Sequence, residues 1–373
     1  MSKSISPLLK NAVCSNKSMT RVFHPIGQGA FYSEHFYCGA DNVFNMVYDC
    51  GTQTNQNNLS QIIKKTFPTI NGKKQQINYL FVSHFHEDHI NGIKMLLNQC
   101  DVENLVIPAI KIKEILLCDY IHNGVRCNNW DNDGNWLMER VLSEPDVRHL
   151  NHENQRISIV KYPGDSEHGS VLQTNNVIAI EKMGWEYLPH CSESGSWKTF
   201  IEKFEKTFPT VYPQFEEYGF FVIKDFFSKS PNDFNRLKQL YKEHYKRTQK
   251  NDNFYSMAIL SKPAYSDDIT DEMMCLYTGD YPARNKKCLK ELKHYFANYW
   301  KNIKTLQAPH HGSWHDNPIE LYDIPKRNCV ISYGTNNTFH HPSEKTLLTL
   351  HFQSEVIVPI NEQKTAYKQT FNW

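Results

Sequence analysis

Hydrophobic and polar residues alternate in two segments near the N-terminus of the chain. The first segment runs from Arg21 to Asp49 and is interrupted by turns at residues 27–29 and 39–42 that contain glycine. The second runs from Ile77 to Ser83 and leads directly into a group of histidines. Alternation with a period of two between such turns is typical of β-strands. The pattern therefore predicts a β-rich region in which a strand ends at a histidine-bearing loop.

Further helix and strand signals follow along the chain. Residues 93–99, IKMLLNQ, have the apolar spacing of a helix, and residues 101–110, DVENLVIPAI, predict another strand. Strand signals return in the last third of the chain, at residues 254–260, 273–280, 304–313 and 328–337. A basic helix is expected between the second and the third of these. Each apolar run ends in polar residues, which favours functional side chains at strand ends.

The middle of the chain has a different composition. Residues 198–250 are rich in Phe, Tyr, Lys and Glu and contain helical stretches broken by prolines. They indicate a largely helical or irregular insertion with approximate bounds 111–250, inside a single domain that spans residues 1–373. The insertion could cover the active site, bind a partner protein or form a dimer surface, and its sequence does not choose among these roles.

The overall composition is that of a folded globular protein, with 40% hydrophobic and 22% charged residues among 373. Lys and Arg number 41 against 40 Asp and Glu, so any phosphate-binding surface must be local. Residues 1–18 lack a signal-peptide core, and no stretch approaches membrane-spanning length. The ten cysteines form no CxxC pair. We expect mostly reduced, buried thiols and a cytoplasmic protein without a membrane partner.

Potential metal ligands are concentrated directly after the second alternating segment. His84, His86, Asp88 and His89 place three imidazoles and a carboxylate within six residues, in a loop that can turn them toward one point. Imidazole and carboxylate suit zinc, and also manganese or iron. A histidine-rich loop without a metal is the alternative. The spacing favours a metal site.

This cluster resembles the H-x-H-x-D-H motif of the metallo-β-lactamase superfamily. More distant segments resemble, in order, motifs of its ComEC-like soluble members: V-G-Q-G, L-I-D-x-G, L-L-T-G-D, P-H-H-G-S and N-x-x-x-H-P. The corresponding segments here are residues 26–29, 47–51, 276–280, 309–313 and 336–343. The resemblance extends from about residue 21 to 345 except for the insertion. It implies an α/β fold, the αββα sandwich, in which two β-sheets pack face to face with helices outside.

The resemblance also implies a ligand set for two divalent metal ions, with zinc expected and manganese as the alternative. His84 and His86 would bind the first ion, Asp88 and His89 the second, and Asp280 would bridge them. The last ligand would be His311, with His310 as the alternative. The superfamily usually supplies one more histidine to the first ion. No obvious motif provides it here, and the candidates are His168 and His190, for which an ordinary hydrogen-bonding role is the competing interpretation.

Other residues are expected to support the chemistry. Asp88, His310 and His341 are the catalytic candidates, since an acid must protonate the leaving group. Asp49 matches a position that supports the ligand loop through hydrogen bonds, and Gln28 either approaches the site or is a plain turn residue. The substrate-binding candidates are Arg284, Lys287 and His340. A solvated helix face is the alternative for the two cations, and packing at a helix start is the alternative for His340.

These features together predict a metal-dependent hydrolase that uses a hydroxide activated by two metal ions. A phosphodiesterase or nuclease is favoured, because the resemblance is to ComEC-like domains and the segment after Asp280 is basic. The expected substrate contains phosphate and could be a nucleic acid or a nucleotide. Two alternatives stay open. One is a hydrolase of carbonyl esters, thioesters or lactones, and the other is a catalytically inactive scaffold or binding module.

Overall fold

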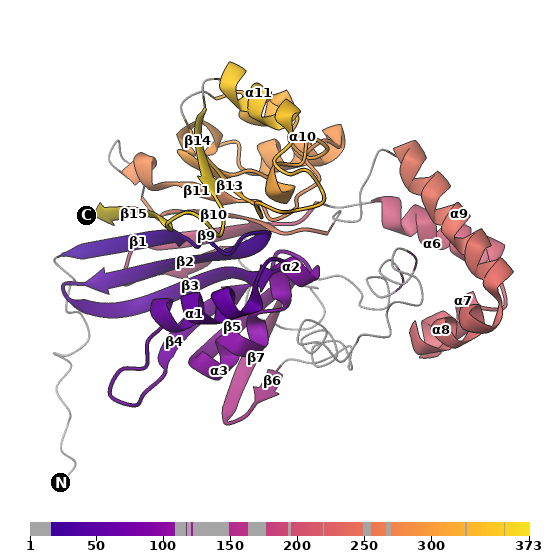
Figure 1. The fold of residues 1–373 in the computed structure, drawn as a ribbon, viewed down its shortest axis with the longest axis horizontal. Helices are drawn as coiled ribbons and strands as arrows, with labels where there is room; N and C mark the ends of the chain where they lie inside the picture. Colours follow the sequence, from indigo (N-terminus) through magenta and orange to yellow (C-terminus); the bar gives the residue numbers. More distant parts are fainter. Residues whose placement is uncertain are drawn as a thin grey trace, which may run out of the picture.

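Two β-sheets pack face to face in the computed structural model, and helices cover their outer faces (Figure 1). The structure describes residues 16–108, 117, 121, 149–162, 177–192, 195–218, 220–248, 255–265, 270–324, 327–353 and 355–373. The αββα sandwich predicted from the sequence is therefore confirmed.

The first sheet has eight strands in the order β15-β1-β2-β3-β4-β5-β7-β6. The strands are β1 (Lys17–Phe23), β2 (Gly29–Cys38), β3 (Asp41–Thr52), β4 (Gln75–Phe81), β5 (Cys100–Pro108), β6 (His149–His152), β7 (Gln155–Tyr162) and β15 (Tyr367–Asn372). Strands β15, β1, β2 and β3 are antiparallel, and β3, β4, β5 and β7 are parallel. The C-terminal strand thus pairs with the first one.

The second sheet has seven strands in the order β14-β13-β12-β11-β10-β9-β8. The strands are β8 (Ile178–Ile180), β9 (Trp185–His190), β10 (Ala258–Pro263), β11 (Cys275–Tyr277), β12 (Thr305–Gln307), β13 (Asn328–Ser332) and β14 (Val356–Ile360). Strands β11 to β14 are parallel, so their carboxyl ends meet at one edge of the sheet.

Helices lie outside the two sheets (Figure 1). On the side of the first sheet they are α1 (Gln56–Thr66), α2 (Glu87–Ile90) and α3 (Ile93–Gln99), and on the side of the second sheet they are α10 (Lys286–Tyr295) and α11 (Glu344–Phe352). Short 3₁₀ helices are η3 (Thr270–Met273), η4 (Trp300–Asn302), η5 (His310–Gly312) and η6 (Ile319–Tyr322). The predicted helix at residues 93–99 corresponds to α3.

Alternate residues of the central strands pack into different hydrophobic cores. On β3, Met46 and Tyr48 point between the sheets, whereas Val47 packs on the outer side of the first sheet. On β11, Tyr277 points between the sheets and Leu276 packs beneath the helices of the second sheet. Strands buried on both faces need nearly continuous apolar sequences. This requirement explains the runs that predicted these strands.

A buried polar network joins the two sheets within this central core. The carboxylate of Glu34 on β2 forms an ion pair with Arg21 on β1, 2.7 Å from Nε to Oε1, and both side chains are fully buried. From the second sheet, Tyr187 and Tyr277 donate hydrogen bonds of 2.7 and 2.9 Å to the same carboxylate. Ser261 of the same sheet donates as well, at 2.8 Å. The buried charge is therefore paired and hydrogen-bonded from four strands.

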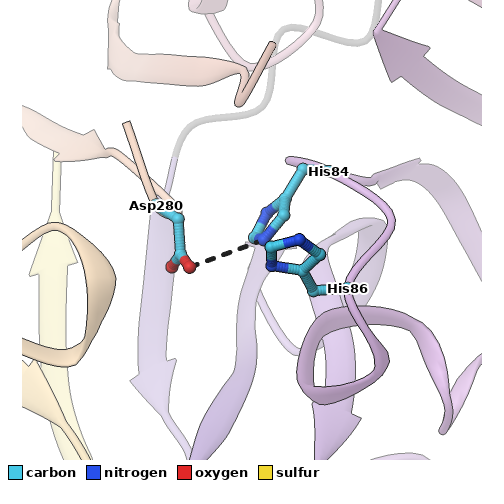
Figure 2. Close-up of side chains that lie close together, drawn as sticks. All are labelled: His84, His86 and Asp280. Carbon is cyan, nitrogen blue, oxygen red and sulfur yellow. Dashed lines mark ion pairs between the residues drawn. The ribbon is translucent and has the colours of Figure 1, made fainter. Parts of the chain in front are cut away.

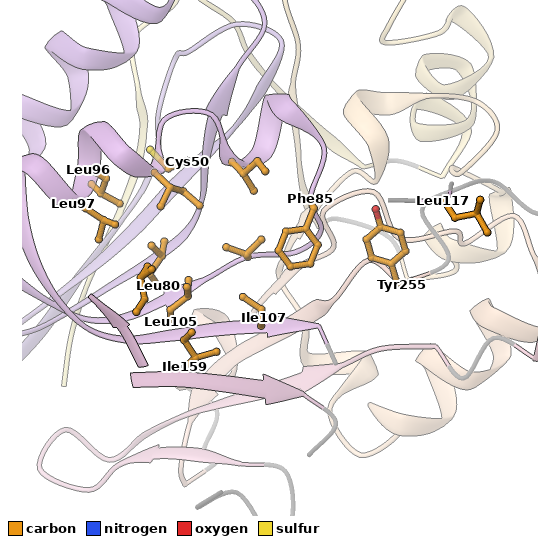
Figure 3. Packing of buried hydrophobic residues seen from close by; sticks show 14 of the residues in the cluster. Cys50, Leu80, Phe85, Leu96, Leu97, Leu105, Ile107, Leu117, Ile159 and Tyr255 are labelled. Carbon is orange, nitrogen blue, oxygen red and sulfur yellow. The ribbon is translucent and has the colours of Figure 1, made fainter. Parts of the chain in front are cut away.

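The helical part of the insertion comprises α6 (Gly195–Thr207), α7 (Tyr212–Tyr218), α8 (Phe220–Lys229) and α9 (Pro231–Thr248), which lie to one side of the sandwich in Figure 1. Strands β6 to β9 also fall within the range 111–250, and they belong to the two sheets. Buried aromatic rings, among them Phe200, Phe204 and Phe215, fill the space between these helices. Leu117 and Tyr255 belong to the same cluster as Phe85, which lies in the loop after β4 (Figure 3).

Two chain-wide expectations concern cysteines and membranes. Six cysteines of the described residues are reduced thiols, Cys50, Cys100, Cys191, Cys275, Cys288 and Cys329, and most are buried. Cys38 is instead disulfide-bonded. In the described parts of the chain, no helix has the length and the apolar composition needed to cross a bilayer.

We expect Glu34→Gln to destabilise the protein strongly, because it leaves the buried Arg21 guanidinium without its countercharge. The free energy of unfolding should fall by about 3–5 kcal/mol, measured by urea denaturation. The control is Asp225→Asn, which breaks the exposed pair between Asp225 and Lys229 on α8. This change should cost less than about 1 kcal/mol. Equal losses in the two variants would contradict the role assigned to the network.

Candidate metal centre

The predicted site residues lie where strands from both sheets end at one edge. Asp49 is near the end of β3, and the histidine cluster follows β4. From the second sheet, Asp280 follows β11, and the turn with His310 and His311 follows β12. Since β3 and β4 are parallel, and β11 and β12 are parallel, each sheet delivers its loops to a single edge.

The structure brings these side chains into two adjacent groups. His84, His86 and Asp280 form one group, and Asp88, His89 and His311 form the other. Within each group the potential ligand atoms all lie within 4.8 Å of one another. Figure 2 shows the imidazoles of His84 and His86 from the first sheet facing the carboxylate of Asp280 from the second.

The carboxylate of Asp280 lies between the two groups. Its Oδ2 is 3.5 Å from Nε2 of His84, and its Oδ1 is 3.2 Å from Nε2 of His89. Oδ1 is also 4.0 Å from Nε2 of His311, which in turn lies 3.1 Å from Oδ2 of Asp88. Each oxygen of Asp280 therefore faces a different group of histidines, which is the arrangement that a bridging ligand requires.

The first sheet holds the imidazoles of His84 and His89 by their Nδ1 atoms. Asp49 accepts hydrogen bonds from the backbone N–H and the hydroxyl of Ser83, both at 2.7 Å, and from Nδ1 of His89 at 2.8 Å. Because the Ser83 hydroxyl donates to Asp49, it accepts from Nδ1 of His84, at 2.9 Å. Protons on both Nδ1 atoms leave the Nε2 lone pairs free to bind a metal.

The two histidines of η5 are held in the same way. Nδ1 of His311 donates to the carbonyl of Ser332 at 3.0 Å, which leaves Nε2 facing Asp88. Nδ1 of His310 lies 2.8 Å from Oδ2 of Asp316, and its Nε2 lies 3.6 Å from Oδ2 of Asp280. His311 thus belongs to the second group, whereas His310 borders the first. Both residues have left-handed backbone φ angles, of 50° for His310 and 53° for His311, and such strain is common at functional sites.

Burial and charge set the protonation of these side chains. Burial, reinforced by the neighbouring His89, lowers the pKa of His84 to about 3. Burial also disfavours the charged form of His89, but the carboxylates of Asp280 and Asp49 outweigh it and raise the pKa of His89 well above its usual value. Burial alone would raise the pKa of Asp280, yet His310 and His89 hold it well below the usual range. A metal that binds here displaces protons from imidazole, so its affinity rises with pH.

Two glycines allow the ligand loops to approach each other. Gly279, with φ of +54°, packs so closely that an added Cβ would lie 2.6 Å from Cβ of Ser83. A Cβ on Gly51 would lie 2.7 Å from backbone atoms of α2. The glycines of L-Y-T-G-D and V-Y-D-C-G therefore permit close contact between the strand ends and the loops that carry the ligands.

The residues present fit a divalent metal ion. Nε2 of His84 and Nε2 of His89 are buried and make no hydrogen bond, although both nitrogens point at a carboxylate. Unsatisfied buried nitrogens cost free energy unless another partner satisfies them. Imidazole nitrogens and carboxylate oxygens in two groups of three are the donors that zinc, manganese and iron accept. These groups support divalent metal binding.

The remaining predicted residues lie around this centre or away from it. The ring of His341 is half-buried and 5.5 Å from that of His310. His340 is exposed, and Arg284 lies in the loop after Asp280. Lys287 is exposed on α10 and pairs with Glu291 of the same helix at 3.5 Å. This position is compatible with the alternative that Lys287 only belongs to a solvated helix face.

Gln28 contacts a residue that is distant in the sequence, Gly334. Its side-chain Oε1 accepts a hydrogen bond of 3.3 Å from the backbone N–H of Gly334, and the residue is buried. The contact ties the loop before β2 to the loop after β13. This contact matches neither of the two roles considered for Gln28, a side chain that approaches the metal groups or a plain turn residue.

The two candidates for a further first-metal histidine have different outcomes. His168 lies outside the described residues. His190 is buried at the end of β9, where Nε2 is 3.2 Å from the hydroxyl of Tyr281 and the ring stacks on Tyr295 at 4.7 Å. It belongs to neither ligand group of the described residues. The hydrogen-bonding interpretation of His190 agrees with this position.

Three contributors to the site were not predicted from the sequence. Ser83 links Asp49 to His84, and Asp316 holds His310. Gln307 accepts hydrogen bonds from the backbone N–H groups of Thr278 and Gly279, at 2.8 and 2.9 Å, and so fixes the loop of Asp280. Their only sequence signal is that each lies within six residues of a predicted ligand.

Comparisons with known proteins agree with this geometry. Residues 41–113, which include the histidine cluster, match the metallo-beta-lactamase superfamily. This segment is therefore similar to the metallo-beta-lactamase superfamily, whose members are generally hydrolases.

Sequence similarity to individual proteins is limited to part of the chain. Ribonuclease J of Mycoplasma genitalium is 31% identical over 85 residues, and ribonuclease J of Mycoplasma pneumoniae is 32% identical over 85 residues. Each alignment covers 22% of this chain and 15% of the ribonuclease. The chain therefore matches about one seventh of the length of these relatives.

We expect His190 to make the protein sensitive to acid. Burial lowers the pKa of its imidazole to about 4, whereas the unfolded chain should have the ordinary value of about 6.5. The unfolded state thus binds the proton more tightly, and stability is lost as the pH falls from about 6.5 through 4. At pH 5 the loss amounts to about 2 kcal/mol.

His190→Gln keeps a hydrogen-bond donor for Tyr281 and removes the titration. Urea denaturation of both proteins at pH 7.5 and pH 5, with a chelator present so that metal binding does not contribute, measures the difference. The pH-dependent loss should be smaller in the variant by about 2 kcal/mol. An equal loss in both proteins would show that His190 does not titrate as its burial indicates.

Proposed function

We propose that this protein is a metal-dependent phosphodiesterase that acts as a nuclease. The observation that carries the proposal is the pair of adjacent His/Asp groups, in which Asp280 of the first group also lies 3.2 Å from Nε2 of His89 in the second. His84, His86 and Asp280 would hold one divalent ion, and Asp88, His89, His311 and Asp280 the other. Zinc is the proposed metal, with manganese as the alternative, because both accept this mixed set of nitrogen and oxygen donors.

Two bound ions would supply Lewis acidity and a water of lowered pKa, which together permit attack on phosphorus without a protein nucleophile. The side chains of this protein supply position and proton transfer. Asp49 and Ser83 fix the ring planes of His84 and His89. Asp280 and Gln307 hold the other side of the centre, since Gln307 anchors the loop on which Asp280 lies.

His310 is the proposed proton donor for the leaving group. Its Nε2 faces the centre at 3.6 Å from Asp280, while its Nδ1 is held by the buried carboxylate of Asp316 at 2.8 Å. A carboxylate on Nδ1 orients an imidazole and stabilises its protonated form, which is what a general acid needs. His341, whose ring is 5.5 Å from that of His310, borders the same space.

The choice of a phosphodiester substrate is supported by similarity and by local charge. The matched relatives are ribonucleases J. Arg284 lies four residues after Asp280, beside His315, and is a cation at the border of the centre. A positive charge beside a dinuclear site favours a substrate that carries phosphate.

We expect the purified protein to contain about two divalent ions per chain and to hydrolyse bis(p-nitrophenyl) phosphate. Asp280→Asn removes the bridging charge and should lower the metal content and reduce kcat/KM by about 10³-fold. Elemental analysis and a chromogenic assay measure the two effects. Asp225→Asn, the same change at an exposed position of α8, is the matched control.

Three results would contradict this proposal. Metal-loaded protein that hydrolyses esters or lactones but no phosphodiester would assign the centre to carbonyl chemistry. Absence of bound metal after loading would favour a scaffold. Undiminished hydrolysis by Asp280→Asn would place the activity elsewhere.

His310→Gln tests the proton donor through the leaving group. We expect the metal content to stay at the wild-type level. The kcat for cleavage of an oligonucleotide should fall by about 10²–10⁴-fold, because the leaving group is a sugar alkoxide that must be protonated. Hydrolysis of bis(p-nitrophenyl) phosphate should fall far less, because p-nitrophenolate leaves without protonation. Asp316→Asn should also slow cleavage of the oligonucleotide more than hydrolysis of bis(p-nitrophenyl) phosphate, by a smaller factor than His310→Gln.

The control is His351→Gln, which changes an exposed histidine on α11. Equal losses on the two substrates in His310→Gln would refute the role of proton donor. Loss of bound metal in that variant would instead identify His310 as a ligand of the first ion.

A further inference from the structure

Two cations lie over one indole ring beside the candidate metal centre. Cζ of Arg284 is 3.9 Å and Nζ of Lys345 is 4.3 Å from the centre of the Trp314 ring. Arg284 comes from the loop after β11, Trp314 from the segment after η5, and Lys345 from the first turn of α11. We name these three residues the tryptophan clamp.

The charges of the clamp are not neutralised by carboxylates. In the described part of the chain, neither Arg284 nor Lys345 forms an ion pair, and Arg284 donates a hydrogen bond of 2.9 Å to Nδ1 of His315. The two positive charges lie no farther apart than the sum of their distances from the ring. Like charges at this spacing repel each other, and cation–π attraction to Trp314 offsets part of that repulsion. An anion in contact with both cations would remove it.

The clamp is adjacent to the proposed catalytic centre in the chain and therefore in space. Trp314 follows His311 by three residues, and Arg284 follows Asp280 by four. At about 3.6 Å per residue, their Cα atoms lie within about 11 and 14 Å of those two residues. A substrate held at the centre can thus reach the clamp with its next charged group.

An exposed aromatic ring borders the same centre. Phe339 is 57% exposed, and its ring stacks on that of His341 at 6.0 Å with an interplanar angle of 18°. His341 in turn lies 5.5 Å from the ring of His310. The outward face of a ring fixed in this way is a platform on which a nucleobase can stack.

We propose that the tryptophan clamp binds a backbone phosphate next to the one being cleaved, and that Phe339 stacks a base of the same strand. The substrate class is therefore single-stranded nucleic acid. The proposal rests on the proposed function, which supplies the cleaved phosphate. A duplex keeps its bases paired and stacked, so it cannot offer one to Phe339, and a small phosphodiester has no second phosphate for Arg284 and Lys345.

Binding is measured by fluorescence anisotropy of labelled single-stranded DNA and RNA and of a duplex of the same sequence. The protein carries His310→Gln, which is expected to retain the bound metal and to slow cleavage of an oligonucleotide during the titration. Arg284→Gln with Lys345→Gln should reduce the slope of log affinity against log salt concentration by about 0.7, the value for one lost phosphate contact on a single strand. Phe339→Ala should weaken single-strand binding about 10-fold and duplex binding much less.

The matched control is Arg236→Gln with Lys238→Gln on α9. These residues also lie over aromatic rings, Phe208 at 5.6 Å and Phe234 at 4.3 Å, and their replacement removes the same charge from the insertion. Weaker binding of single-stranded DNA or RNA in the clamp variant than in the control supports the proposal. The strand that binds more tightly shows whether the preferred sugar is deoxyribose or ribose. Trp314→Phe keeps a ring for the cations and should retain most of the affinity, which separates loss of the clamp from loss of folding.

An equal loss in the control, an unchanged salt slope in the clamp variant, or duplex binding as tight as single-strand binding would overturn the proposal. Failure of the proposed function has a different signature. In that case the wild-type protein would bind single strands through the clamp and yet cleave no phosphodiester.

Discussion

The arrangement of the two sheets depends on one buried carboxylate, that of Glu34. Hydrophobic packing alone does not fix the register between two sheet faces, because apolar contacts are not directional. Glu34 accepts from Arg21 in its own sheet and from Tyr187, Ser261 and Tyr277 in the other. Each of these bonds requires a particular distance and direction. A sliding of one sheet over the other would leave a buried charge unsatisfied, so the network selects a single alignment.

This alignment matters for the centre because the two sheets contribute different parts of it. Tyr277 bonds to Glu34 and lies three residues before Asp280, so the same strand that joins the sheets also delivers the bridging carboxylate. His84 and His89 come from the opposite sheet and meet Asp280 at 3.5 and 3.2 Å. Errors of about 1 Å in such sites cost much of their activity. The chemistry therefore requires that the sheets be joined rigidly close to the ligands, as they are at Tyr277, three residues before Asp280.

The sequence patterns predicted individual strands and the histidine cluster, because both are encoded locally, whereas the sandwich and the distant residues Asp280 and His311 were implied by the resemblance to the metallo-β-lactamase superfamily. Alternating apolar runs identify strands such as β4, and the histidine cluster follows that strand directly. Contacts between distant segments were not predictable. Strand β15 pairs with β1 across the whole chain, Asp316 binds His310 only because η5 turns back, and Gln28 meets Gly334 in another loop. Strands β6 to β9 were missed within the insertion because they lie at or next to the edges of the sheets and have mixed polarity.

The histidine and aspartate groups account for hydrolysis at a metal centre, but they do not determine which substrate is hydrolysed. Similar centres on this kind of fold can serve several hydrolytic reactions, so the choice of substrate must come from groups beside the centre. In the described residues these groups lie on the segments that follow Asp280, His311 and β13 in the second sheet. Asp316, on the segment after His311, orients His310, and the three segments also present cations and an exposed ring. A change in these segments could therefore alter the substrate while the first sheet, with its histidine cluster anchored on Asp49, stays the same.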